Sequence, residues 1–150
     1  MTGLPEGSFT SSVESSAKAY TATVVMIPLA EVSEALSGLA VKKNYHQQSM
    51  GQNDSYGGLP RLAMEGTGLD GSIYVFADEG ADPERVRQLF SADFSAWINK
   101  RPEKFFGFEF GQGTLVTKNP KLVKNAEELD AHVETAVEIA RRLKASAQGA

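Results

Sequence analysis

Histidine is the side chain best suited to proton transfer near neutral pH, and the chain contains two, His46 and His132. His46 lies in a polar stretch that also holds Ser49, Asp54 and Tyr56, groups that a small hydrolase could use beside a histidine base. The sequence has no G-x-S-x-G motif, and no set of residues supplies a nucleophile, a base and an orienting group together. We therefore expect no catalytic residues, and a hydrolase that uses His46 is the alternative interpretation.

The metal-ligating residue types do not occur at ligand spacing. The chain has no H-x-x-x-H or H-E-x-x-H pair, and the absence of cysteine excludes thiolate metal sites and thiol chemistry. Asp78, Glu79 and Asp82 form an acidic cluster, but Gly80-Ala81 interrupts the regular oxygen ligands of a calcium loop. Helix capping accounts for Asp82. We expect no bound metal and no cofactor.

Two further patterns imitate binding motifs for nucleotides and nucleic acids. The segment 66–71 matches G-x-G-x-x-G, yet a strand and not a helix is expected after it, which indicates a hairpin turn. Phe106, Phe108 and Phe110 alternate near several lysines, as in some sheets that bind single strands, but burial in a core explains the period of two without a ligand and is the favoured interpretation. With a net charge of −4, we expect no nucleic-acid partner.

The polar stretch from 45 to 60 is the strongest candidate for a binding surface. It combines aromatic and hydrogen-bonding side chains with Gly51, Gly57 and Gly58, which is more than a structural connector needs. The candidate ligand- or partner-binding residues are Tyr45, His46, Gln48, Asn53 and Tyr56. A disordered connector is the alternative, and protection from amide exchange in the presence of a ligand would distinguish the two.

Length and composition predict one mixed domain that positions these residues. The chain has 150 residues, of which 41% are hydrophobic and 23% charged, which suits a single hydrophobic core. Residues 1–18 are rich in Ser, Thr and Gly and predict a flexible lead-in, while 19–150 form the domain. Strands are expected at 20–29, 39–44, 61–65, 71–77, 104–110 and 114–118, the last four as two hairpins.

Two long amphipathic helices are expected to cover one face of a mainly antiparallel sheet. The first spans 82–100, with Asp82 as N-cap and Pro83 at the first helical position. The second spans 125–147, where Asn125 and Glu128 have the N-cap and N3 spacing of a capping box. The C-terminal part then has the order ββα-ββα, and the fold class is an α+β two-layer sandwich. The residues expected in its core are Phe94, Trp97, Phe108, Val133 and Val137.

The order of these features resembles a soluble domain of uncharacterised actinobacterial proteins, in which the domain often follows membrane-spanning segments. The resemblance is carried by Val24-Val-Met-Ile-Pro-Leu, Ile73-Tyr-Val-Phe-Ala-Asp, Arg87-Gln-Leu-Phe with Trp97-Ile, Phe108-Glu-Phe-Gly-Gln-Gly-Thr-Leu-Val and the final amphipathic helix. It implies an α+β domain and a bacterial origin, but no established activity and no catalytic residue.

We therefore expect a non-catalytic interaction module or small-ligand-binding module of unknown biochemical activity. Its partner would be another protein or a small apolar ligand, the latter enclosed between the C-terminal helix and the sheet, and a homodimer is a further option. The sequence has neither a basic leader followed by an apolar stretch nor an apolar run of membrane-spanning length. We expect no membrane insertion of this chain and a cytoplasmic location.

Overall fold

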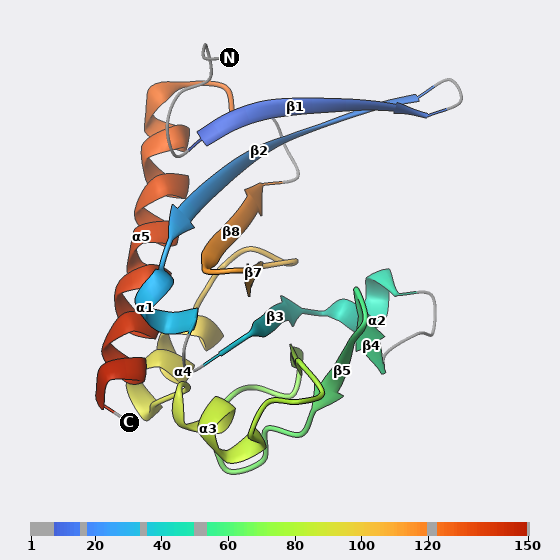
Figure 1. The fold of residues 1–150 in the computed structure, drawn as a ribbon. Helices are drawn as coiled ribbons and strands as arrows, with labels where there is room; N and C mark the ends of the chain where they lie inside the picture. The colour runs from blue at the N-terminus through green and yellow to red at the C-terminus, as the bar shows by residue number, and fades with distance from the viewer. Residues whose placement is uncertain (1–7, 16–17, 34–35, 50–53, 120–122, 150) are drawn as a thin grey trace.

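The strands pair into one antiparallel sheet in the order β1-β2-β8-β7-β3-β6-β5-β4 (Figure 1). The computed structural model describes residues 8–15, 18–33, 36–49, 54–119 and 123–149. Within them the strands are β1 Ser8–Ser15, β2 Lys18–Pro28, β3 Gly38–Lys43, β4 Ser55–Tyr56, β5 Leu59–Leu62, β6 Ile73–Ala77, β7 Gly107–Gly111 and β8 Thr114–Asn119. The two-residue β4 pairs with β5 alone, so the other seven strands form the body of the sheet.

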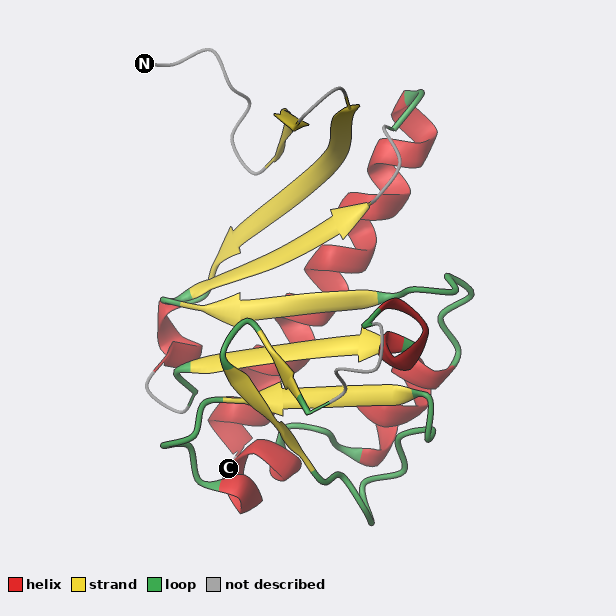
Figure 2. Ribbon diagram, turned by 90° about the vertical axis from the view of Figure 1, so that its right-hand side faces the viewer, coloured by secondary structure: helices red, strands yellow, loops and turns green. Residues whose placement is uncertain are grey.

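The helices of the described residues are α1 Ala30–Ser33, α2 Tyr45–Gln48, α3 Pro83–Gln88, α4 Ala92–Asn99 and α5 Ala126–Gly149. The 24-residue α5 runs along one face of the sheet, and Figure 2 shows the strands in front of it. An α+β fold with an antiparallel sheet is therefore confirmed. In the described part of the chain, no helix is long and apolar enough to cross a membrane.

Both predicted hairpins are present. β5 pairs with β6, with Arg61 opposite Phe76, and β7 pairs with β8. The turn between β7 and β8 places Gln112 and Gly113 at φ of 52° and 74°, the two positive values of a type I′ turn, which glycine adopts without strain. β3 lies between β6 and β7, so it joins the two hairpins into one sheet.

The predicted helix at 82–100 is wrong as a single element, because the structure has α3 and α4 in its place. The side chain of Asp82 caps α3 by accepting a hydrogen bond from the Glu84 amide, as expected. A second cap follows, since the Ser91 side chain accepts from the Phe94 amide and the Ser91 backbone is extended at ψ 165°. An extended N-cap residue starts a new helix, so only α5 is long.

Helix α5 begins with the predicted cap. The Asn125 side chain accepts a hydrogen bond from the Glu128 amide, and Glu128 in turn accepts from the Lys124 amide. The buried stripe consists of Ala136, Ile139, Ala140 and Leu143. Val137 is 49% exposed, so its predicted place in the core is wrong, and Val133 is only partly buried. The stripe of α5 that contacts the sheet is therefore shifted by about one residue from the predicted stripe, which contained Val133 and Val137.

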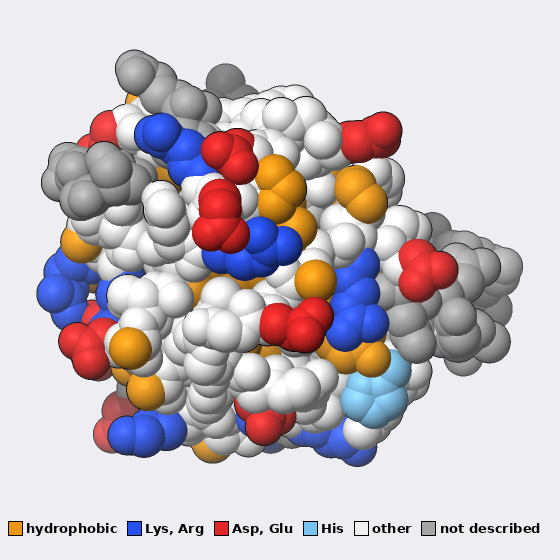
Figure 3. Space-filling view, turned by 90° about the horizontal axis from the view of Figure 1, so that it is seen from below, with side chains coloured by type: hydrophobic (Ala, Val, Ile, Leu, Met, Phe, Trp, Pro, Cys, Tyr) orange, Lys and Arg blue, Asp and Glu red, His pale blue; other side chains and the backbone are white. Residues whose placement is uncertain are grey.

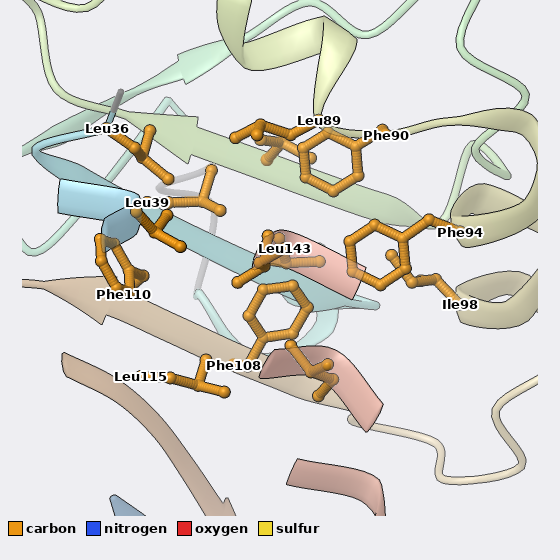
Figure 4. Close-up of a cluster of buried hydrophobic side chains, with 14 of the residues drawn as sticks. Leu36, Leu39, Leu89, Phe90, Phe94, Ile98, Phe108, Phe110, Leu115 and Leu143 are labelled. Carbon is orange, nitrogen blue, oxygen red and sulfur yellow. The ribbon is translucent and has the colours of Figure 1, made fainter. Parts of the chain in front are cut away.

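The core lies between the sheet and the helices, where side chains from both layers converge (Figure 4). Phe94 and Phe108 are almost fully buried, as predicted. Trp97 is partly buried at the edge of this core, with its ring 4.1 Å from the Arg101 guanidinium and 5.6 Å from that of Arg142. Its predicted place inside the core is therefore corrected to a boundary position that two cations cover.

At the other end of the sheet, β1 is an edge strand whose pairing with β2 runs from Ser8 opposite Val25 to Ser15 opposite Lys18. It falls within the stretch that the sequence predicts as a flexible lead-in. The division into lead-in and domain stays a prediction.

Candidate functional site

Three of the predicted site residues meet on the sheet face opposite α5. Tyr45 and His46 lie in α2 and Tyr56 in β4, and their rings surround Tyr74 and Phe76 of β6. Ring centroids are 5.7 Å apart for Tyr45 and Tyr56, 5.1 Å for Tyr45 and Phe76, and 5.9 Å for the stacked rings of His46 and Tyr74. We call these five residues the aromatic cluster. Asn53 and the Gln48 side chain lie outside the described part of the structure.

The polar ends of the aromatic cluster have structural partners. The Tyr56 hydroxyl donates a hydrogen bond to the Glu109 carboxylate, and Lys42 Nζ lies 3.0 Å from the same carboxylate. Burial and this hydrogen bond raise the pKa of Tyr56. Burial alone would raise the pKa of Glu109, but the contacts with Tyr56 and Lys42 outweigh it and lower that pKa. The Tyr56 hydroxyl thus stays protonated and anchors the loop to the sheet.

A different place in the molecule has the shape of a ligand site. A cavity of about 350 Å³ opens between α5, the β7–β8 hairpin and the segment 103–107. We call it the α5 cavity. Its walls are formed by Glu103, Lys104, Phe105, Phe106, Gly107, Thr117, Lys118, His132, Thr135 and Ile139. Such a volume, with apolar walls from Phe105, Phe106 and Ile139 beside several polar side chains, lies in the range of small-molecule sites.

Two buried polar atoms of residues that line the α5 cavity have no hydrogen-bond partner in the described part of the chain. Thr117 is 4% exposed, and its Oγ1, like Nε2 of His132, is buried without a hydrogen bond to any residue in the part of the chain that the structure describes. Burial lowers the pKa of His132. The charge of Glu103 and a hydrogen bond between the imidazole and the Thr117 backbone act in the opposite direction but do not outweigh burial. The imidazole is therefore neutral at pH 7. Buried polar atoms are normally hydrogen-bonded, so this pair needs an explanation.

The backbone around the α5 cavity is fixed by close packing. A Cβ atom added to Gly107 would lie 2.7 Å from the Val41 carbonyl oxygen, so only glycine lets the start of β7 approach β3 there. The Lys43 amide donates a hydrogen bond to the Phe106 carbonyl beside it. The segment that forms the cavity rim is thus attached to the centre of the sheet.

Sequence reasoning allowed an apolar ligand between the C-terminal helix and the sheet, but it assigned neither Thr117 nor His132 to such a site, although the sequence holds a signal for each. Thr117 alternates with Leu115 on the inward face of β8, and a polar residue in an inward position of a strand is unusual. His132 precedes Ala136 by one helical turn, which places it at the N-terminal end of the buried stripe of α5. Only the folded chain brings these positions together with the segment 103–107.

The other surfaces are less distinctive. A second hollow of about 470 Å³ lies along β5, and among its lining residues Arg61 lies 3.8 Å from the Tyr74 ring. On the face of the molecule seen from below, acidic and basic side chains alternate, and neither sign dominates (Figure 3). Within the described residues, no cluster of His, Asp and Glu could hold a metal ion.

Comparisons with known proteins show a likeness in fold. The sequence matches no protein-family model and no curated protein. A similar fold occurs in the crystal structure of the mycobacterial trehalose monomycolate transport factor A, TtfA, with a TM-score of 0.57 and 10% sequence identity. The match covers 90% of this chain and 71% of that one. The chain thus shares its fold with an actinobacterial protein, in agreement with the resemblance seen in its sequence.

Proposed function

We propose that the chain is a non-catalytic binding protein that holds a small, largely apolar ligand in the α5 cavity. One observation carries the proposal: Thr117 and His132, whose buried hydroxyl and imidazole nitrogen have no hydrogen-bond partner in the described part of the chain, belong to the wall of a cavity that Phe105, Phe106 and Ile139 also line. Leaving a buried polar atom unpaired costs about 1–3 kcal/mol, and a ligand that pairs with these atoms removes that cost.

The arrangement of the polar atoms supports binding over catalysis. A hydroxyl nucleophile needs a hydrogen bond to its base, and the base needs a third group that orients it. Thr117 Oγ1 and His132 Nε2 have no hydrogen bond to each other or to any other residue in the described segments. At the aromatic cluster, the Tyr56 hydroxyl is engaged by Glu109. These contacts do not activate a nucleophile.

The likeness to TtfA supports the same interpretation. The name of that protein describes a transport factor for trehalose monomycolate. A cavity between a long helix and an antiparallel sheet gives this fold a place for an apolar group, which fits a role in binding or transport.

Native mass spectrometry with a pair of α5 variants tests the proposal. Thr135 lines the cavity, so Thr135→Phe should fill it, whereas Val137→Phe places the same ring on the exposed side of the helix. We expect purified wild type and Val137→Phe to carry a bound small molecule, or to take one up from a panel of amphiphiles, and Thr135→Phe to lose it. Equal binding by Thr135→Phe, or no uptake by any of the three proteins, would contradict the proposal.

The aromatic cluster is a second candidate, for a partner protein. The specific observation is that the fold gathers Tyr45, His46 and Tyr56 at one place and leaves His46 exposed. Residues 45–58 should then gain protection from amide exchange when a partner from cell extract is added. A hydrolase screen with a His46→Ala control tests the enzymatic alternative, which requires turnover that disappears in the variant.

A further inference from the structure

We infer that the ligand of the α5 cavity is an uncharged amphiphile, a single alkyl chain of about ten carbon atoms that ends in a hydroxyl-bearing group such as an alcohol or a sugar. The inference rests on the proposed function and adds the chemical class of the ligand. It follows from the volume of the cavity, from the hydrogen-bonding capacity of its polar atoms and from the position of its charges.

The volume sets the length of the apolar part. At about 30 Å³ for each water-sized group, 350 Å³ holds about a dozen such groups. Phe106 and Ile139 are buried and form the apolar wall, and Phe105 is 39% exposed at the rim. The cavity therefore accommodates one alkyl chain of moderate length with its polar end.

The polar atoms match a hydroxyl group. The Thr117 hydroxyl can both donate and accept, and Nε2 of a neutral histidine does one or the other. The Thr135 hydroxyl already donates to the Ala131 carbonyl, 3.0 Å away, and can still accept. A ligand hydroxyl, which also donates and accepts, can pair with these atoms whichever tautomer His132 adopts.

The charges disfavour an ionic head group. The three polar side chains Thr117, His132 and Thr135 are neutral, so a carboxylate or an ammonium would lose its hydration there without gaining an ion pair. The charged lining residues Glu103, Lys104 and Lys118 are all exposed, so water screens their charges and an ion pair with a head group would gain little. The charge of Lys118 also acts on Glu109, which lies on the opposite face of the sheet, where it lowers the pKa of that carboxyl. Lys118 is therefore not reserved for a ligand in the cavity.

Three probes with the same chain and different head groups test the inference: decyl glucoside, decanoate and decyltrimethylammonium, each below its micelle concentration. The fluorescence of Trp97, the one tryptophan of the chain, reports binding, because its ring packs 6.1 Å from that of the cavity residue Phe106. We expect decyl glucoside to bind at least tenfold more tightly than either ion.

Two threonine variants test the assigned hydrogen bond. Thr117→Val should weaken the binding of decyl glucoside about threefold to tenfold, the value of one neutral hydrogen bond. Thr23→Val is the matched control, because Thr23 is equally buried but lies outside the cavity wall. His132→Gln gives a second variant of the site, and it should also bind more weakly.

The outcomes separate the inference from the proposed function. Equal or tighter binding of either ion would overturn the ligand class, although the cavity would still be a binding site. Unchanged affinity of Thr117→Val and His132→Gln for decyl glucoside would overturn the assigned hydrogen bonds. If none of the three probes binds, and native mass spectrometry shows no ligand, both the inference and the proposed function fail.

Discussion

Replacing Thr117 by valine should stabilise the ligand-free protein, although it removes a polar residue from a strand. The Thr117 hydroxyl is buried without a hydrogen bond to any residue that the structure describes, so the fold bears the cost of taking it out of water. That cost is about 1–3 kcal/mol for a neutral group. Valine has nearly the same shape, is also β-branched and suits a strand.

The expected gain lies near the lower end of that range. The side chains around a buried polar group relax, which recovers part of the cost of taking it out of water. We therefore expect Thr117→Val to raise the free energy of unfolding by about 1 kcal/mol. For a domain of this size, that corresponds to an increase in Tm of roughly 2–4 °C.

Thr23→Val provides the control, because the two threonines differ in one respect. Both are 4% exposed, and both belong to inner strands of the same sheet. The Thr23 hydroxyl, however, accepts a hydrogen bond from the Val123 amide at 3.2 Å. Its replacement should therefore lower the free energy of unfolding, by about 0.5–1.5 kcal/mol.

Urea denaturation of the three proteins, followed by circular dichroism, measures both changes. The reasoning predicts opposite signs for two chemically identical substitutions. If Thr117→Val destabilises the protein as much as Thr23→Val does, the Thr117 hydroxyl has a partner in the folded chain. The argument for the ligand site would then lose its main observation.

Three further measurements test the core, the buried histidine and the anchor of the loop. Phe94→Ala should lower the free energy of unfolding by about 3–5 kcal/mol, whereas Val137→Ala on the exposed side of α5 should change it by less than about 0.5 kcal/mol. Similar losses for the two variants would contradict the finding that Val137 faces away from the sheet. The folded pKa of His132 lies below its ordinary 6.5, so the unfolded chain binds more protons than the folded chain as the pH falls through 6.5. Wild type should therefore lose stability in that range relative to His132→Gln. Parallel profiles of stability against pH for the two proteins would refute this. Glu109→Gln should destabilise the protein and weaken the protection of the loop amides around Tyr56 from exchange, and unchanged exchange would show that their hydrogen bond does not anchor the loop.

The sequence by itself determined the elements whose signals are local. Apolar runs predicted most of the strands, the glycines of Gly111-Gln112-Gly113 predicted the turn between the last two strands, and the caps at Asp82 and Asn125 predicted two helix starts. Each of these signals depends on backbone preferences and hydrogen bonds within a few residues. Such preferences can be read without knowing the rest of the fold.

Tertiary packing decided which part of each element faces the core. The apolar spacing continues across Ser91, but the backbone is extended at that residue and a new helix starts there, and Phe90 and Phe94 are both buried. Leu143 fits either of two overlapping stripes of α5, and contact with the sheet selected the one that contains Ile139 and excludes Val137. Periodicity defines a stripe only to within about one residue.

The sequence allowed an apolar ligand between the C-terminal helix and the sheet, but only the tertiary structure showed which residues form the candidate site. Thr117 and His132 belong to different elements, and the segment 103–107 is a third part of the chain. Each residue taken alone is an ordinary polar side chain, and it becomes informative only because folding buries it without a partner. The predicted loop residues Tyr45 and Tyr56, in contrast, were conspicuous in the sequence, and the fold uses their rings to cover the outer face of the sheet.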